Sequence, residues 1–166
     1  MYSSRDGITD HPAGRRLREV EQAFNLNVVY GHRTFKGLNG LTVRPEVLLI
    51  DVTRMDLTRV NDFKRRMYDA YRIPSDRYED SWEFDQYVKL APPAVMALHA
   101  LGACNDECTI LAHEFMGMPT ALAAMIDGHP NFRTLFYAHE VAPMRKIVEE
   151  HEGHDTMFYN ALRHAV

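Results

Sequence analysis

The spacing of apolar and polar positions predicts strands and helices along the whole chain. Apolar residues recur at i, i+3 and i+4 across residues 15–24, a pattern typical of an amphipathic helix. Apolar runs at residues 28–30, 41–43 and 47–52 predict strands separated by turns. The first two runs can pair, which predicts a β-hairpin near residues 28–52. The third run is apolar on both faces, as in a buried central strand.

Two longer segments with helical composition follow. Residues 56–71 are heavily charged and predict a helix with a solvated face. Residues 82–101 form the longest helical stretch, and their large apolar residues trace one face. This stretch contains Pro92 and Pro93. Because proline lacks a backbone donor and clashes with the preceding turn, we expect the pair to kink the helix or to split it in two.

The second half of the chain alternates regularly between strands and helices. Strands are predicted at residues 109–113 and 132–138, and helices at about 119–125 and about 143–150. Consecutive strand–helix–strand units imply right-handed crossovers and a parallel sheet. We therefore expect an α/β fold with a mainly parallel sheet.

Each strand of this second half ends at the same three residues, Ala-His-Glu. The first copy ends with His113 and Glu114, and the second with His139 and Glu140. Open α/β sheets bind their ligands at the carboxyl ends of the strands, so we expect these four side chains to line a site. Imidazole donates hydrogen bonds to hydroxyl groups and carboxylates accept them, which suits a sugar or phosphate ligand.

Histidine and glutamate are also ligands for zinc, so a metal site is an alternative. However, Gly117 occupies the position of the second histidine of an H-E-x-x-H motif. Consecutive strand residues also point to opposite faces, which separates each His-Glu pair unless the strand has ended. A further cluster at residues 151–155 contains a glycine and is typical of an exposed polar loop. No G-x-S-x-G, G-x-G-x-x-G or Walker motif is present, and spacing alone assigns no Cys-His or Ser-His-Asp triad.

Charge and composition narrow the classes of partner. The net charge is −4, and no stripe of lysine and arginine indicates a nucleic-acid partner. No apolar run approaches the ~18 residues of a membrane span, and no signal peptide is visible. The two cysteines, Cys104 and Cys108, are too few for a zinc site of four cysteines, and we expect them to be reduced. These features predict a cytoplasmic protein.

Two segments resemble consecutive strand ends of glycogen and starch synthases. The line His113-Glu-Phe-Met-Gly-Met-Pro-Thr-Ala-Leu122 is similar to the His-Asp-Trp strand end of those enzymes and the small-residue helix after it. Arg133-Thr-Leu-Phe-Tyr-Ala-His-Glu140 is similar to the Thr-Ile-His-Asn strand end that comes next. The order of the preceding elements is similar too, and the resemblance covers roughly residues 40–145.

The resemblance implies a retaining glycosyltransferase of the GT-B type, with two Rossmann-like domains around a cleft. Residues 1–166 would form one Rossmann-like, three-layer domain, the amino-terminal and acceptor-side part of a larger protein. A carboxyl-terminal domain, missing from this chain, would bind a sugar-nucleotide donor such as UDP-glucose or ADP-glucose as substrate. A glycan or another acceptor would receive the hexose. The family needs no metal and no further cofactor.

The resemblance also implies roles for individual residues. His139 would stand where the family's catalytic-cleft histidine contacts the transferred sugar. His113 and Glu114 would be catalytic residues that line the same cleft, with Glu114 in place of the family's aspartate. Glu140 would contact substrate, and Phe115 would replace the family's tryptophan as a packing residue at the binding site.

The chain also departs from the family. The Lys-x-Gly-Gly loop near the first strand of the synthases is absent, and so is the half that holds the donor diphosphate. We therefore expect no measurable transferase activity from these 166 residues alone. Two alternatives stay open. One is a small metal-dependent hydrolase or metal-binding protein that uses the His113–Glu114 and His139–Glu140 pairs, and the other is a non-catalytic α/β binding domain.

Overall fold

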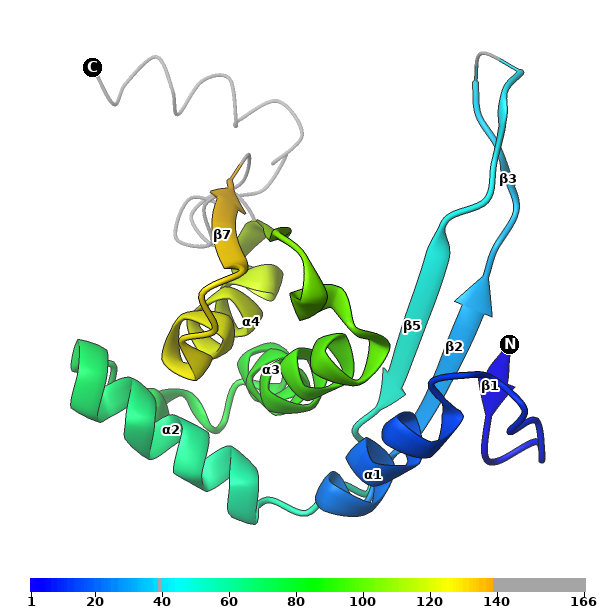
Figure 1. The fold of residues 1–166 in the computed structure, drawn as a ribbon. Helices are drawn as coiled ribbons and strands as arrows, with labels where there is room; N and C mark the ends of the chain where they lie inside the picture. Colours follow the sequence, from blue (N-terminus) through cyan, green and yellow to red (C-terminus); the bar gives the residue numbers. More distant parts are fainter. Residues whose placement is uncertain (39, 139–166) are drawn as a thin grey trace, which may run out of the picture.

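The computed structural model describes residues 1–38 and 40–138 (Figure 1). In chain order its main elements are β1 (Tyr2–Ser3), α1 (Gly14–Phe24), β2 (Asn27–His32), β3 (Phe35–Lys36), β4 (Thr42–Val43), β5 (Glu46–Asp51), α2 (Thr58–Tyr71), α3 (Trp82–Leu101), β6 (Cys108–His113), α4 (Glu114–Asp127) and β7 (Phe132–Tyr137). Short 3-10 helices at Ser75–Tyr78 and Ala103–Asn105 flank α3. The expected mixture of helices and strands is confirmed.

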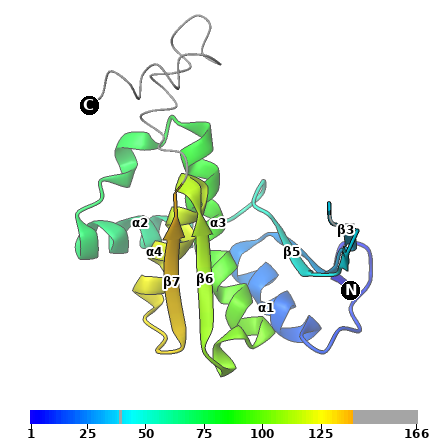
Figure 2. The same ribbon diagram turned by 90° about the horizontal axis from the view of Figure 1, so that it is seen from above.

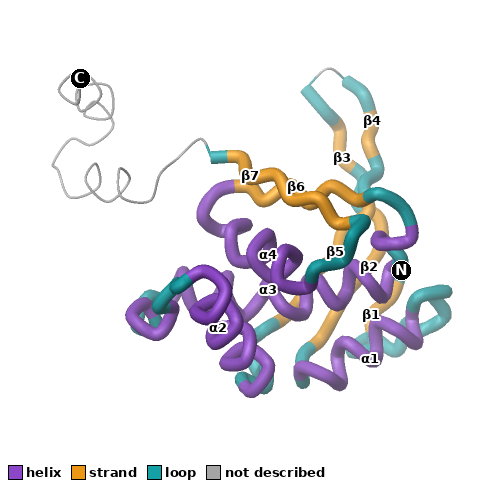
Figure 3. Tube along the Cα trace, turned by 60° about the vertical axis from the view of Figure 1, so that its left-hand side comes forward, coloured by secondary structure: helices purple, strands orange, loops and turns teal. Residues whose placement is uncertain are grey.

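The predicted hairpin is present in the amino-terminal half. β2 pairs antiparallel with β5 from Asn27 opposite Asp51 to His32 opposite Glu46, and β1 pairs with the other edge of β2. β3 and β4 form a separate two-stranded ladder at the tip of the hairpin (Figure 3). The main partner of β2 is therefore β5, and residues 41–43, which we expected to pair with residues 28–30, belong to the tip.

The expectation that residues 47–52 form a strand buried on both faces is wrong. β5 is an edge strand of the described sheet, where it pairs with β2 alone. Leu48 and Ile50 pack against the core, whereas Leu49 on the opposite face is 60% exposed. An antiparallel strand can leave one face in solvent, so an apolar run need not be buried on both sides.

The helices enclose the main hydrophobic core, and α3 lies centrally among them, in contact with α1, α2 and α4 (Figure 1). Each helix contributes an apolar face, as the i, i+3, i+4 spacing predicts. The prolines at positions 92 and 93 do not split α3, which runs unbroken from Trp82 to Leu101. Pro93 is itself buried, so packing along the helix offsets the lost backbone hydrogen bonds. The core residues of the four helices include Leu17, Val20, Phe24, Val60, Phe63, Met67, Val88, Ala91, Val95, Ala123 and Ala124.

β6, α4 and β7 form the predicted strand–helix–strand unit. The two strands are parallel, with Cys108 opposite Phe132 and His113 opposite Tyr137. Figure 2 shows them side by side, and α4 packs against both. Because parallel strands need a crossover, α4 provides the connection. The helix begins at Glu114, directly after the strand, whereas the apolar pattern predicted a start near residue 119.

The expected mainly parallel sheet is not found in the described residues. Their strands form three small sheets, and β6–β7 is the parallel pair, whereas the other pairs are antiparallel. The hairpin that joins β2 to β5 explains part of this difference, because strands joined by a hairpin must run antiparallel. β1 is also antiparallel to β2, although α1 lies between them in the sequence. The helix predicted at residues 143–150 lies outside the described residues. None of the helices in residues 1–38 and 40–138 is long and apolar enough to cross a lipid bilayer.

Candidate functional site

The first Ala-His-Glu segment forms a sharp turn from strand into helix. His113 ends β6 with extended backbone angles, φ −92° and ψ 118°. Glu114 begins α4 with a φ of 62°, in the left-handed region that non-glycine residues seldom adopt. Such a conformation costs about 1–3 kcal/mol and is found disproportionately at functional sites. The turn places the side chains of His113, Glu114 and Phe115 in three different environments: the surface, the interior and a pocket.

Two small residues make this turn possible. Ala112 is 3% exposed and lies in β6 immediately before the turn. Gly117 lies in the first turns of α4, and a Cβ atom at this glycine would be 2.9 Å from the Cα atom and the carbonyl carbon of Ala112. The helix therefore returns over the end of its own strand at a distance that only glycine allows.

His113 lies on the exposed outer face of the β6–β7 pair. Its ring stacks on the ring of Tyr137, the residue opposite it in the parallel register, with centroids 5.5 Å apart and an interplanar angle of 22°. Tyr137 is 51% exposed. The carboxyl ends of the two strands thus present an imidazole and a phenol ring together at the surface, as the strand-end argument predicts for His113.

Glu114 points the other way. Its side chain is 2% exposed, so the structure does not bring it to the surface that carries His113. Consecutive residues of a strand alternate between faces, and the turn preserves this alternation across the boundary. The carboxylate belongs to the first turn of α4, where the positive end of the helix dipole stabilises a negative charge.

Phe115 extends into a mainly apolar pocket beneath the strand ends. Its ring meets the ring of Tyr87 from α3 edge to face, with centroids 5.9 Å apart. The pocket has a volume of about 430 Å³, within the range of small-molecule sites. Its lining comes from α2, α3, α4 and β7 and includes Met67, Phe84, Tyr87, Phe115, Met118 and Phe136.

The histidine and glutamate of the second Ala-His-Glu segment, His139 and Glu140, lie outside the described residues, as does the cluster at residues 151–155. Within the described part of the chain, no group of three or more histidine, cysteine, aspartate or glutamate side chains is arranged to hold a metal ion. Sequence reasoning missed Tyr137 and Tyr87, although the equal offset of His113 and Tyr137 from their strand starts could have identified the first.

No protein-family model, no curated protein and no solved structure matches this chain.

Proposed function

We propose that this chain is the acceptor-side domain of a retaining glycosyltransferase, which transfers a hexose from a sugar nucleotide to a glycan or another acceptor. The observation that carries the proposal is the stacked pair of His113 and Tyr137 at the carboxyl ends of two parallel strands. This is the edge at which α/β sheets bind ligands. The resemblance of these strand ends to those of glycogen and starch synthases supports the same assignment.

The exposed pair has the chemistry to bind a sugar. A tyrosine ring offers an apolar face and a polar hydroxyl group, and an imidazole donates or accepts hydrogen bonds to sugar hydroxyls. The apolar pocket at Phe115 would hold a less polar part of the acceptor or pack the wall of the cleft. On this proposal His139 and Glu140 complete the same wall, and Glu114 keeps His113 in place.

Exposed apolar residues on the outer face of the β6–β7 pair also support the proposal that this chain is part of a larger protein. Leu111 is 59% exposed and Leu135, opposite it in register, is 51% exposed. Parallel sheets occur almost entirely with both faces covered. A Rossmann-like, three-layer arrangement would cover Leu111 and Leu135 with further chain, and would leave His113 and Tyr137 at the strand ends open to a second lobe.

A transferase of this kind acts by positioning two substrates and by stabilising the diphosphate that leaves the donor. We propose that the donor, such as UDP-glucose or ADP-glucose, binds to a separate domain outside these 166 residues. His113 and His139 would then orient the hexose for attack by the acceptor. The 166 residues alone would bind an acceptor but would not catalyse measurable transfer.

Binding of maltooligosaccharides, short chains of glucose, tests the proposal. The isotopically labelled chain would be titrated with them and followed by two-dimensional NMR. We expect shift changes at His113, Tyr137 and their neighbours, and at least about fivefold weaker binding in His113→Ala, because one hydrogen bond contributes about 1 kcal/mol. His32→Ala is the matched control, since this partly exposed histidine ends β2 in the separate amino-terminal sheet.

Four outcomes would count against the proposal. The first is an absence of shift changes at β6 and β7, and the second is an equal loss of binding in the two histidine variants. The third is stoichiometric zinc that is lost in the His113→Ala/His139→Ala double variant, which would favour the metal-dependent alternative. The fourth is robust turnover of UDP-glucose or ADP-glucose by the 166-residue chain, which would contradict the proposed division between two domains.

A further inference from the structure

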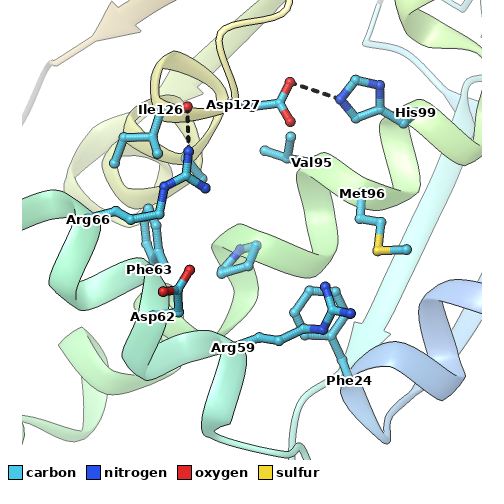
Figure 4. Close-up of a pocket in the computed structure, with 12 residues that line it drawn as sticks. Phe24, Arg59, Asp62, Phe63, Arg66, Val95, Met96, His99, Ile126 and Asp127 are labelled. Atoms are coloured by element: carbon cyan, nitrogen blue, oxygen red, sulfur yellow. Dashed lines mark hydrogen bonds and ion pairs between the residues drawn. The ribbon is translucent and has the colours of Figure 1, made fainter.

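The imidazole of His99 joins two other reactive side chains near the carboxyl end of α3. Its Nε2 atom lies 2.9 Å from Oδ2 of Asp127, the last residue of α4 (Figure 4). Its Nδ1 atom lies 3.2 Å from Sγ of Cys104, in the 3-10 helix that follows α3. One ring therefore bridges a thiol and a carboxylate that lie 5 and 28 positions from it in the sequence.

The carboxylate decides which nitrogen of His99 carries the proton. An ionised carboxylate only accepts hydrogen bonds, so Nε2–H donates to Asp127. In the neutral ring, Nδ1 then has the unshared electron pair, and this atom faces Cys104. The S–H group can donate to Nδ1 and transfer its proton there. Cys104, His99 and Asp127 thus form the arrangement of nucleophile, base and orienting residue by which enzymes activate cysteine.

The wider surroundings of His99 contain charges of both signs. The ring of His129, in the loop after α4, has its centroid 5.3 Å from that of His99. On the side of α2, Arg59, Asp62 and Arg66 line the same pocket as His99, which has a volume of about 250 Å³ (Figure 4). The contact with Asp127 orients the ring so that its Nδ1 atom faces Cys104.

We propose that Cys104 is a reactive thiol that forms mixed disulfides with low-molecular-weight disulfides, with His99 as its base and Asp127 as the residue that positions the ring. The thiol proton moves to Nδ1, and the sulfur attacks one sulfur of the small disulfide. A new S–S bond forms at Cys104 as the old S–S bond breaks. The leaving thiolate takes the proton from His99, so one small thiol is released and the small disulfide is the oxidant.

Cys108 provides a matched comparison, because both cysteines are free and partly exposed. The full chain would be prepared as Cys104→Ser and Cys108→Ser variants, each with one thiol. Both would be incubated with oxidised glutathione at neutral pH, and the mixed disulfide would be measured by mass spectrometry. We expect Cys104 to react about tenfold faster than Cys108, because an unassisted thiol is only a few per cent thiolate at neutral pH.

Variants of His99 and Asp127 show whether Cys104 reacts faster because these two residues activate its thiol or only because the thiol is exposed. In the Cys108→Ser background, His99→Ala and Asp127→Asn should each bring the Cys104 rate to within about twofold of the Cys108 rate, whereas Asp127→Glu should restore most of it. Circular dichroism checks folding, and the Asp127→Asn and Asp127→Glu pair carries the test if His99→Ala does not fold. Equal rates at the two cysteines, or an unchanged Cys104 rate in Asp127→Asn, would overturn the proposal.

Discussion

Gly117 in α4 lies directly against Ala112 in β6. A Cβ atom at position 117 would be 2.9 Å from the Cα atom and the carbonyl carbon of Ala112 and 3.2 Å from its Cβ atom. These are mainly backbone atoms, which cannot rotate away as a flexible side chain can. The contact fixes how closely α4 returns over the end of β6, and therefore where His113 and Phe115 lie.

Gly117→Ala should destabilise the protein and displace the strand–helix turn. Overpacking of this kind costs about 1–3 kcal/mol in the free energy of unfolding. Urea unfolding would measure the loss, and Gly31→Ala is the control, because a Cβ atom there would first meet the flexible side chain of Met1 at 3.2 Å. Equal losses in the two variants would contradict the special role of the Gly117 contact.

The sequence predicts well the helices and strands that depend on the local spacing of apolar residues. The predicted helix at residues 15–24 corresponds to α1 at Gly14–Phe24, because its apolar spacing and its burial have the same period. The parallel pairing of β6 and β7 follows from the helix between them. The start of α4 was predicted too late, because the left-handed φ of Glu114 arises from packing of the helix onto β6 and not from a local preference for glutamate.

The candidate site is predictable only in part for the same reason. The strand pattern places His113 at the carboxyl end of a strand, where the structure has it. The partners of these residues depend on tertiary packing: Tyr137 meets His113 through strand register, and Tyr87 meets Phe115 through the packing of α3 on α4. Asp127 lies 28 positions from His99, so no sequence spacing could nominate their contact.

Ser81→Ala should weaken the start of α3. The Oγ atom of Ser81 accepts a hydrogen bond of 3.4 Å from the backbone N–H of Phe84, which satisfies one of the first amide groups of the helix. Replacement of such a cap by alanine costs about 0.5–2 kcal/mol, and the long distance places this one near 0.5. Ser81→Gly is the control and should lose only a few tenths of a kcal/mol. Thermal unfolding would rank the two variants, and equal stability of Ser81→Ala and wild type would contradict capping.

Glu21→Gln should destabilise the amino-terminal sheet, although glutamate and glutamine side chains are nearly the same size. The Glu21 carboxylate is 7% exposed and accepts hydrogen bonds from the Tyr2 hydroxyl at 2.7 Å, the Ser4 hydroxyl at 2.6 Å and the Val28 N–H at 2.8 Å. An amide has one acceptor oxygen, so if that oxygen keeps the bonds from Ser4 and Val28, the Tyr2 hydroxyl loses its acceptor and must accept from the NH₂ group instead. Because hydrogen bonds to charged groups contribute about 1.5–3 kcal/mol each, we expect a loss of about 2–3 kcal/mol in urea unfolding.

Glu19→Gln is the matched control for this change. Glu19 lies on the same helix, and its contact with Arg15 joins two exposed side chains 3.6 Å apart. Exposed ion pairs contribute about 0–1 kcal/mol, so this variant should stay close to wild type. A loss in Glu21→Gln no larger than that in Glu19→Gln would show that the buried carboxylate does not hold β1 and β2 to α1.

Loss of the Tyr30 proton should make the protein less stable in alkaline solution. Burial of the side chain and then the neighbouring Glu46 carboxylate raise the pKa of Tyr30 from 10.0 to about 12. Below pH 10 the tyrosine is protonated in both states, so its contribution to stability is fully present. Above pH 10 the unfolded state loses its proton first, and the contribution falls as the pH rises toward the folded-state pKa of about 12.

The free energy of unfolding, measured by urea titration from pH 8 to above pH 11, tests this linkage. Tyr30→Phe removes the titrating group, so its stability should fall less steeply above pH 10 than that of wild type. The slope should not vanish, because burial also raises the pKa of Tyr2. Tyr71→Phe is the control, since Tyr71 is 39% exposed, and it should keep the wild-type slope. If Tyr30→Phe and Tyr71→Phe have the same slope, the alkaline loss of stability does not come from Tyr30.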